Sequence, residues 1–448
     1  MTGIRSCITA IERPLDSHDT FARNMIREVL SNGLTVVTDS LAHVRPIGLC
    51  VCVNRGSRDE EPSMNGIANL TRLMVMANFR LMIAKNSYLH FLPDVLSPWP
   101  DYSPETLTTR DLTYFYLSTF DPDLKTVIDV LAEIILNPVF EEQELERQKL
   151  RLYDEIERSE ADSKKWIHQT LMEQFWPRQC LSRPILGRRE TVEKITSNTL
   201  LNYFSDVYVA SNIIVLAVGN LEHRKLRDLV SERLGPLLKG EGRKQDSPPR
   251  SNPGLVRYPT TTEPAYACLA FGVPGYCNSD EYSLWVLNDM LGESGISLLK
   301  RDVRDKAGLA HSIYSELELF RGNGLLTIDL ECGRQHMARA IDRTFELLQM
   351  LKKVPLPAEV ERSKNRLKAK TAMKYDAIVG RTSLRMLSEV YNGRSSELSE
   401  ILAKIDRTTT KDVQRVARDF LELHKLGGLI VGSGIEENRW AQVGLRVW

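Results

Sequence analysis

The chain has 448 residues, and its 59 Lys and Arg balance 59 Asp and Glu, so the formal net charge is zero. This balance argues against nucleic acid or another polyanion as the main partner, because proteins that bind them need clustered positive charge. The length exceeds what one compact core uses and indicates two or more domains. Apolar runs such as NIIVLAV are far shorter than the roughly 18 residues of a membrane-spanning helix, so we expect no membrane span.

The cysteines and histidines predict no cofactor. The seven cysteines include no C-x-x-C pair and no Cys/His cluster with zinc spacing. The eight histidines are scattered along the chain, with no pair spaced as zinc ligands on one helix would be. Buried free thiols and a reducing compartment fit this pattern best.

Residues 1–26 are expected to form an N-terminal extension. This segment has no apolar core for secretion, and it contains Glu12, Asp16 and Asp19, whereas transit peptides are poor in acids. We therefore expect a cytoplasmic protein, with the mitochondrial matrix as the alternative.

Residues 27–238 predict a first α+β domain. The Asn32-Gly33 turn opens its first strand, and a hairpin is expected about Arg110-Asp111. The expected elements are, in chain order, strands within 27–40 and 45–57, a helix over 66–84, strand material over 106–119, helices over 121–136, 141–176 and 196–208, a strand over 212–220 and a helix over 222–237.

Residues 239–254 predict a linker, because they are rich in Gly, Pro, Ser and charge and lack apolar periodicity. The second domain, 255–448, then repeats the order of the first, which indicates an internal duplication. Its expected elements are a strand over 265–275, a helix over 280–291, strands over 308–319 and 322–332, helices over 336–351, 356–375 and 409–423, and a strand over 427–434. Groups of strands followed by groups of helices are typical of an α+β fold.

Three segments carry a resemblance to a known family. They are GSRDE at 56–60, with the Gly66-Ile67 pair that follows it, SRPILGRRETV at 182–192, and IDRTTTKDVQRVARDF at 405–420. They resemble the pitrilysin-type metallopeptidases, inverted zincins with an H-x-x-E-H motif, and within them the bacterial processing-peptidase-like branch. The family includes the mitochondrial processing peptidase and the core proteins of respiratory complex III.

The resemblance covers nearly the whole chain and implies a particular architecture. It implies two duplicated α+β domains, each a mainly antiparallel sheet packed with helices, that face each other across a peptide-binding chamber. A peptide would be held there as an added strand.

The zinc motif of the family is missing. Asn69, Arg72 and Leu73 stand where the motif places a metal-binding His, the general-base Glu and the second metal-binding His. Leu73 has no donor atom, Asn69 is a poor zinc ligand, and Arg72 would repel the cation. Glu155 matches the third ligand of the family, while Gln148 replaces a supporting acid. Because a lone carboxylate cannot hold zinc, the resemblance implies no metal and no catalytic residue.

One hypothesis concerns the vacated pocket. The guanidinium of Arg72 can replace the zinc charge and pair with Glu155, since an unpaired buried carboxylate would be costly. The alternative is that Arg72 points to solvent and that Glu155 is exposed.

The family also holds its substrate with an Arg and a Tyr seven residues apart. Arg304 and His311 match these positions, so the Arg is retained and His replaces the Tyr. A neutral imidazole can still donate one hydrogen bond to a peptide carbonyl, so we expect Arg304 and His311 to be substrate-binding residues. The alternative is a structural Arg at a helix end and a His within a strand.

The function implied is that of a catalytically inactive peptidase homologue. We expect the non-catalytic subunit of a heteromeric zinc peptidase, which helps to bind or enclose a peptide substrate, with a zinc-bearing homologous subunit, or a second copy of itself, as partner. Two alternatives stay open. One is a structural scaffold like the complex III core proteins, and the other is a zinc metalloendopeptidase with unrecognised ligands.

Overall fold

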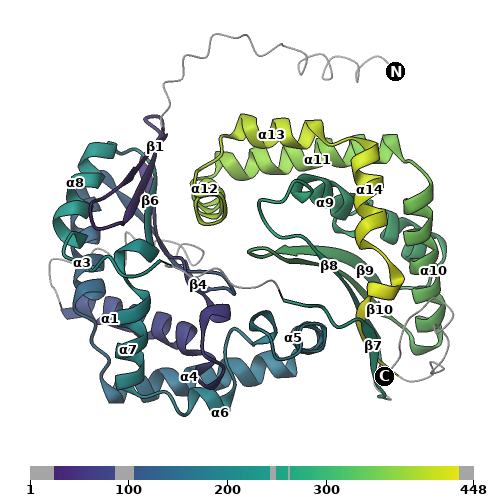
Figure 1. Ribbon diagram of the computed structural model, residues 1–448, viewed down its shortest axis with the longest axis horizontal. Coiled ribbons are helices and arrows are strands. Elements are labelled where there is room, and N and C mark those ends of the chain that lie inside the picture. The colour runs from purple at the N-terminus through teal and green to yellow at the C-terminus, as the bar shows by residue number, and fades with distance from the viewer. Residues whose placement is uncertain (1–24, 86–104, 243–248, 261–262, 433–448) are drawn as a thin grey trace, which may run out of the picture.

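The computed structural model describes residues 25–85, 105–242, 249–260 and 263–432. These residues build two sheets on opposite sides of the molecule, each covered by helices (Figure 1). The predicted N-terminal extension lies almost entirely outside the described residues, as does part of the predicted linker. Below, the parts before and after residues 239–254 are called the first half and the second half.

The first half contains a mainly antiparallel sheet with the spatial order β1-β2-β6-β3-β5-β4, in which β2 and β6 are parallel. Its strands are β1 Met25–Val29, β2 Thr35–Ser40, β3 Pro46–Val53, β4 Glu105–Thr108, β5 Thr113–Phe120 and β6 Ile213–Gly219. Its α-helices are α1 Ile67–Lys85, α3 Leu124–Leu136, α4 Glu142–Ala161, α5 Ser163–Phe175, α6 Arg189–Val192, α7 Ser197–Val207 and α8 His223–Leu234.

The second half contains a sheet with the order β7-β11-β8-β10-β9, in which β7 and β11 are parallel. Its strands are β7 Gly254–Tyr258, β8 Ala265–Val273, β9 Ser312–Leu319, β10 Gly324–Cys332 and β11 Gly427–Val431. Its α-helices are α9 Glu281–Asn288, α10 Arg334–Lys353, α11 Pro357–Asp376, α12 Ile378–Asn392, α13 Leu398–Arg407 and α14 Thr410–Phe420.

The two sheets share one topology. The order β2-β6-β3-β5-β4 matches β7-β11-β8-β10-β9 strand for strand, with the same parallel pair and the same antiparallel pairs. The predicted duplication and the predicted α+β class are therefore confirmed. Strand β1, at the outer edge of the first sheet, has no counterpart among the described strands of the second sheet.

Some expected elements are corrected. The single helix expected over 141–176 is two helices, because Asp162 is extended and its carboxylate accepts hydrogen bonds from the backbone N–H groups of Lys164 (3.0 Å) and Lys165 (3.2 Å). Such an N-cap begins a new helix, α5, in a new direction. Strands β1 and β7 and helices α6, α12 and α13 were not predicted from the sequence.

Both faces of the first sheet are buried, which explains the continuous burial of β3. Alternate residues of β3, such as Leu49 and Val51, pack with α1 and α3, while Cys50 and Cys52 point to the opposite face. That opposite face is covered by α12, which comes from the second half and contributes Met386.

The second sheet is covered in the reciprocal way. Its outer face packs with α9, α10 and α14, and the face toward the middle of the molecule receives α5 from the first half. Helix α5 lies on β8 and β11, the counterparts of the strands β3 and β6 beneath α12. Figure 1 shows α5 and α12 in the space between the two sheets. We call α5 and α12 the crossing helices.

Buried charges attach α12 to the first sheet. The carboxylate of Asp39 on β2 accepts hydrogen bonds from Arg381 (2.7 and 2.9 Å) and from Arg385 (2.9 Å). Asp39 and Arg385 are each about 1% exposed. A paired guanidinium satisfies a buried carboxylate, so these residues join the two halves.

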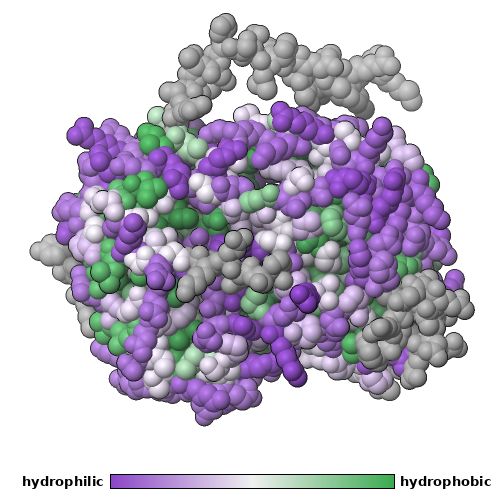
Figure 2. Space-filling view, in the orientation of Figure 1, coloured by the Kyte–Doolittle hydropathy of each residue, from purple (hydrophilic) through white to green (hydrophobic). Residues whose placement is uncertain are grey.

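The outer surface of the second half is mainly hydrophilic over α11, α13 and α14 (Figure 2). Within the described ranges, every helix is too short or too polar to cross a membrane.

Candidate functional site

A cavity of about 1020 Å³ lies between the two halves. Helix α1 contributes Asn69 and Arg72 to its lining, α4 contributes Glu155, and α5 contributes His168. The second sheet contributes Glu318 from its edge strand β9. The position that matches the zinc motif therefore lies in the wall of a chamber shared by both halves.

A buried carboxylate positions the start of α1. Glu60 accepts hydrogen bonds from the backbone N–H groups of Gly66 and Ala68, both 2.9 Å, and from the side chain of Asn65 at 2.7 Å. Burial raises the pKa of Glu60 to about 7, although these three donors oppose the rise. The acid of the GSRDE segment thus satisfies N–H groups that the first turn of a helix leaves without partners.

The GSRDE and SRPILGRRETV segments meet at this point. Gly66 and Gly187 both have positive φ, and a Cβ added to Gly187 would lie 2.5 Å from the carbonyl oxygen of Asn65. The hydroxyl of Thr191 donates to that same carbonyl at 2.7 Å. Only glycine allows this close approach, so the two segments form one cradle that holds α1 in place.

The three motif positions carry no zinc donors. Asn69 is buried, and its carbonyl oxygen accepts hydrogen bonds from Arg72 Nε (3.2 Å) and Nη2 (2.8 Å). Arg72 Nη1 donates to the carbonyl and the hydroxyl of Thr106 on edge strand β4, at 3.2 and 2.7 Å. Leu73 packs against the hydrophobic core. The two segments that hold the start of α1 are therefore present. The three positions of the zinc motif make polar or apolar contacts within the protein instead of offering metal ligands.

The predicted pair of Arg72 and Glu155 is wrong. Within the described part of the chain no ion pair joins them, because the guanidinium is committed to Asn69 and Thr106. Glu155 is exposed to the chamber. Its charge still acts on Arg72: burial lowers the pKa of Arg72, and Glu155 opposes this effect. The alternative that Arg72 points to solvent is also wrong, whereas the exposure of Glu155 agrees with it. Gln148 is buried and donates to Glu144 at 2.6 Å.

The predicted substrate-binding pair lies elsewhere. Arg304, in the helical turns Lys300–Lys306, donates to Asp305 at 2.7 Å, and its side chain is 38% exposed. His311 is exposed, and its backbone N–H donates to the carbonyl of Glu331 at 2.8 Å. Neither residue is among the described residues that line the chamber cavity. A role of Arg304 and His311 in holding substrate therefore stays a prediction.

Two family models match the chain, one after the other. The model of the insulinase family, peptidase family M16, matches residues 35–189, and the model of the peptidase M16 inactive domain matches residues 194–367. The chain belongs to peptidase family M16. The predicted resemblance to inverted-zincin peptidases is thereby confirmed.

Relatives cover nine tenths or more of this M16 chain. The uncharacterized zinc protease YmxG of Bacillus subtilis is 27% identical over 409 residues, which cover 91% of this chain and 98% of the relative. The mitochondrial-processing peptidase subunit beta of Blastocladiella emersonii is 24% identical, with 90% and 87% covered. A chain in the solved complex III2 of Candida albicans has the same fold, with a TM-score of 0.78, 20% identity, and 94% and 99% covered.

Sequence reasoning missed one group of residues in this M16 chain. His168 on α5, Cys268 on β8 and Asp329 on β10 lie together on the inward face of the second sheet. They are far apart in the sequence and on three different elements, so no spacing rule could find them. The sequence gives one partial signal, because β8 and β10 were both predicted as strands.

Proposed function

We propose that this M16 family member is a non-catalytic subunit of a heteromeric zinc peptidase and that its chamber helps to bind or enclose peptide substrate. The observation that carries the proposal is the contrast at α1. The cradle built by Glu60, Gly66 and Gly187 is retained, while Asn69, Arg72 and Leu73 offer no set of zinc donors. Without a metal or a positioned general base there, the main rate-enhancing terms of a zinc peptidase are missing.

The chamber supports a binding role. Its lining mixes both signs of charge with apolar side chains over a volume of about 1020 Å³, which suits an extended peptide better than one small ligand. Arg72 already occupies the Thr106 carbonyl on edge strand β4. A peptide that added a strand there would have to displace this contact.

A scaffold is the second candidate. The likeness in fold to a chain of the Candida albicans complex III2 favours it, because that chain is part of a larger assembly. The proposed compartment is the cytoplasm, with the mitochondrial matrix as the alternative.

The test is peptide hydrolysis with added zinc. We expect the chain alone to be inert, and we expect it to raise the kcat/KM of an H-x-x-E-H-bearing homologue from the same source on mixing. Arg304→Ala should remove that gain. Arg301→Ala is the matched control, because Arg301 lies on the same helical turns and pairs with Glu359 instead. If mixing changes nothing and no complex forms, the scaffold is favoured. Zinc-dependent hydrolysis by the chain alone would overturn both candidates.

A second test restores the donors. The triple variant Asn69→His, Arg72→Glu, Leu73→His should bind one more zinc ion per chain than the parent protein, with Glu155 as the third ligand. If the triple variant folds and binds no additional zinc, the cradle itself has lost the geometry of a metal site.

A further inference from the structure

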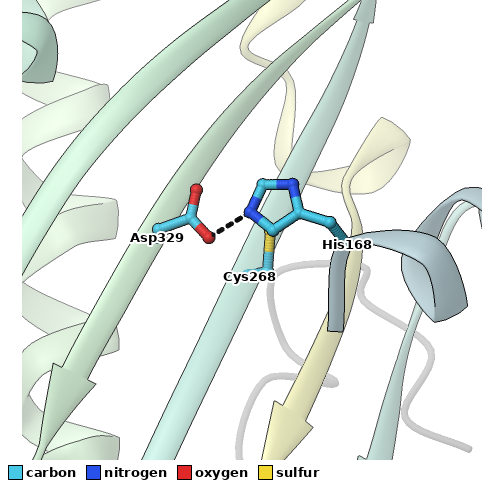
Figure 3. Close-up of side chains that lie close together, drawn as sticks. All are labelled: His168, Cys268 and Asp329. Atoms are coloured by element: carbon cyan, nitrogen blue, oxygen red, sulfur yellow. Dashed lines mark hydrogen bonds and ion pairs between the residues drawn. The ribbon is translucent and has the colours of Figure 1, made fainter. Parts of the chain in front are cut away.

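Three side chains of different chemistry converge on the inward face of the second sheet (Figure 3). His168 Nε2 lies 2.7 Å from Asp329 Oδ1, and Cys268 Sγ lies 3.9 Å from the same ring nitrogen. All three candidate donor atoms lie within 4.8 Å of one another. Cys268 is fully buried, while the side chains of Asp329 and His168 are 12% and 31% exposed.

The fold places these residues together. Cys268 and Asp329 are directly opposite each other on the antiparallel strands β8 and β10, so their side chains share one face. Helix α5 lies on that face through Ile167 and Leu171, which are buried against the sheet. His168 follows Ile167 and therefore reaches the Cys268 and Asp329 pair from the rim of the helix.

The arrangement differs from a catalytic triad. In a triad, the two ring nitrogens of the His face different partners, the nucleophile on one side and the carboxylate on the other. Here Asp329 and Cys268 both approach Nε2. Donors that gather about one point are what a metal ion requires.

The distances are near those of a zinc site. With Zn–N and Zn–O bonds of about 2.0–2.2 Å and a Zn–S bond of about 2.3 Å, tetrahedral donors are about 3.4–3.6 Å apart. The His168–Asp329 hydrogen bond would open by less than about 1 Å and the His168–Cys268 distance would shorten slightly. The third pair, Cys268 and Asp329, is at most 4.8 Å apart and would have to close by at most about 1.2 Å.

The surrounding charge favours a cation. Glu316 and Glu318, on neighbouring β9, are exposed on the same face. Burial acts to lower the pKa of His168, but Asp329 and these two glutamates outweigh it and raise that pKa. Burial, and then Asp329, raises the pKa of Cys268, so a metal would displace the thiol proton on binding. Two cations lie near these acids: Lys164 is 3.9 Å from Glu331, and Arg110 interacts electrostatically with Glu318.

We propose that His168, Cys268 and Asp329 form a binding site for a divalent transition metal, with zinc as the ion that their N, S and O donors fit best. Three protein ligands leave a fourth position for water or an incoming group. His168 also lines the chamber cavity, so that position is reached from the chamber. The ion joins α5 of the first half to the second sheet. This proposal is independent of the proposed function.

The test is metal binding by the full chain after chelator treatment. We expect one zinc ion per chain in a titration against a chelating dye. Cobalt in place of zinc should give a sulfur-to-metal charge-transfer absorption, which reports the Cys268 thiolate directly. Cys268→Ala should abolish that absorption, and Asp329→Asn and His168→Gln should each weaken binding about tenfold or more.

Cys50→Ala is the matched control, because Cys50 is a buried thiol beneath the other crossing helix. It should keep full cobalt absorption and zinc affinity. Thermal melting without metal shows whether each variant is folded, and His168→Gln, at a partly exposed position, provides a variant that need not disturb the core. Absence of the cobalt–thiolate absorption in the parent chain, or its persistence in Cys268→Ala, would overturn the proposal.

Discussion

The two crossing helices hold equivalent places in the duplicated fold and have opposite chemistry. Helix α12 covers β3 and β6 of the first sheet, and α5 covers their counterparts β8 and β11 in the second. Each lies over a buried cysteine. Beneath α12, Cys50 contacts Met386 Sδ at 3.5 Å and stands opposite Tyr116 on β5. Beneath α5, Cys268 contacts His168 and stands opposite Asp329.

The charges at the two contacts also differ in kind. Arg381 and Arg385 of α12 hold Asp39, and a guanidinium stays charged at any pH at which the protein is folded. The corresponding ion pair at α5 depends on His168, and an imidazole loses its charge as pH rises; burial acts to lower the pKa of His168, but Asp329 outweighs it and raises that pKa. The ion pairs that attach α12 to the first sheet are therefore independent of pH. The ion pair that attaches α5 to the second sheet depends on pH and, under the proposal above, on a bound metal ion.

The largest effect is expected from a variant that removes the ion pairs between Asp39 and helix α12. Asp39→Asn removes the carboxylate that Arg381 and Arg385 of α12 share. Arg385 keeps Glu397 as a partner at 3.1 Å, but it is almost fully buried and loses its buried counter-charge. We expect a loss of about 3–5 kcal/mol in the free energy of unfolding, measured by urea denaturation. The control Asp406→Asn removes an exposed partner of Lys368 and should cost less than about 1 kcal/mol. Equal losses in the two variants would contradict a special role of Asp39.

An intermediate effect is expected from zinc at the other crossing helix. A ligand that binds only the folded state, present at about 100 times its Kd, stabilises a protein by about 2.7 kcal/mol. Zinc should therefore raise the Tm of the parent chain and of Cys50→Ala, while the Tm of Cys268→Ala should stay unchanged. A rise of the same size in Cys268→Ala would place the stabilising ion elsewhere.

The smallest effect concerns pH in the presence of a chelator. The pKa of His168 is raised in the folded protein, so the pair with Asp329 stabilises fully below the unfolded pKa of about 6.5 and less as pH rises through the folded pKa. Because His168 is partly exposed, His168→Gln should cost at most about 1 kcal/mol at pH 6 and less at pH 9. The cost of Asp39→Asn should be the same at both values. Denaturation of each variant at both pH values makes the measurement.

The sequence predicts well where structure is local. Helix α1 was predicted to within two residues at each end because its apolar residues are regularly spaced. The repeated succession of strands and helices along the chain indicated the duplication, but the order of the strands within each sheet came only from the structure. Helix α12 escaped prediction because the face it buries includes Arg385 and Glu389, which resemble a solvated surface in the sequence. Its burial depends on partners more than three hundred positions away in the sequence, such as Asp39.

The candidate site shows the same limit. The loss of ligands at 69, 72 and 73 is visible in the sequence, since the motif is a short helical spacing. The sequence does not reveal that Arg72 donates to Thr106, because Thr106 lies on the edge strand β4, 34 positions away along the chain. For the same reason the cluster at His168 could not be predicted, since only strand register and the crossing of α5 bring its members together.

The exchange of helices has a consequence for how the molecule comes apart. If the chain is cut within 239–254, each fragment carries the helix that covers the other fragment's sheet. Separated fragments would expose Val37 and Leu216 on one side and Ala270 and Leu429 on the other. Nicked protein should therefore remain associated as a stable pair, and fragments produced separately should regain their structure only when they are combined.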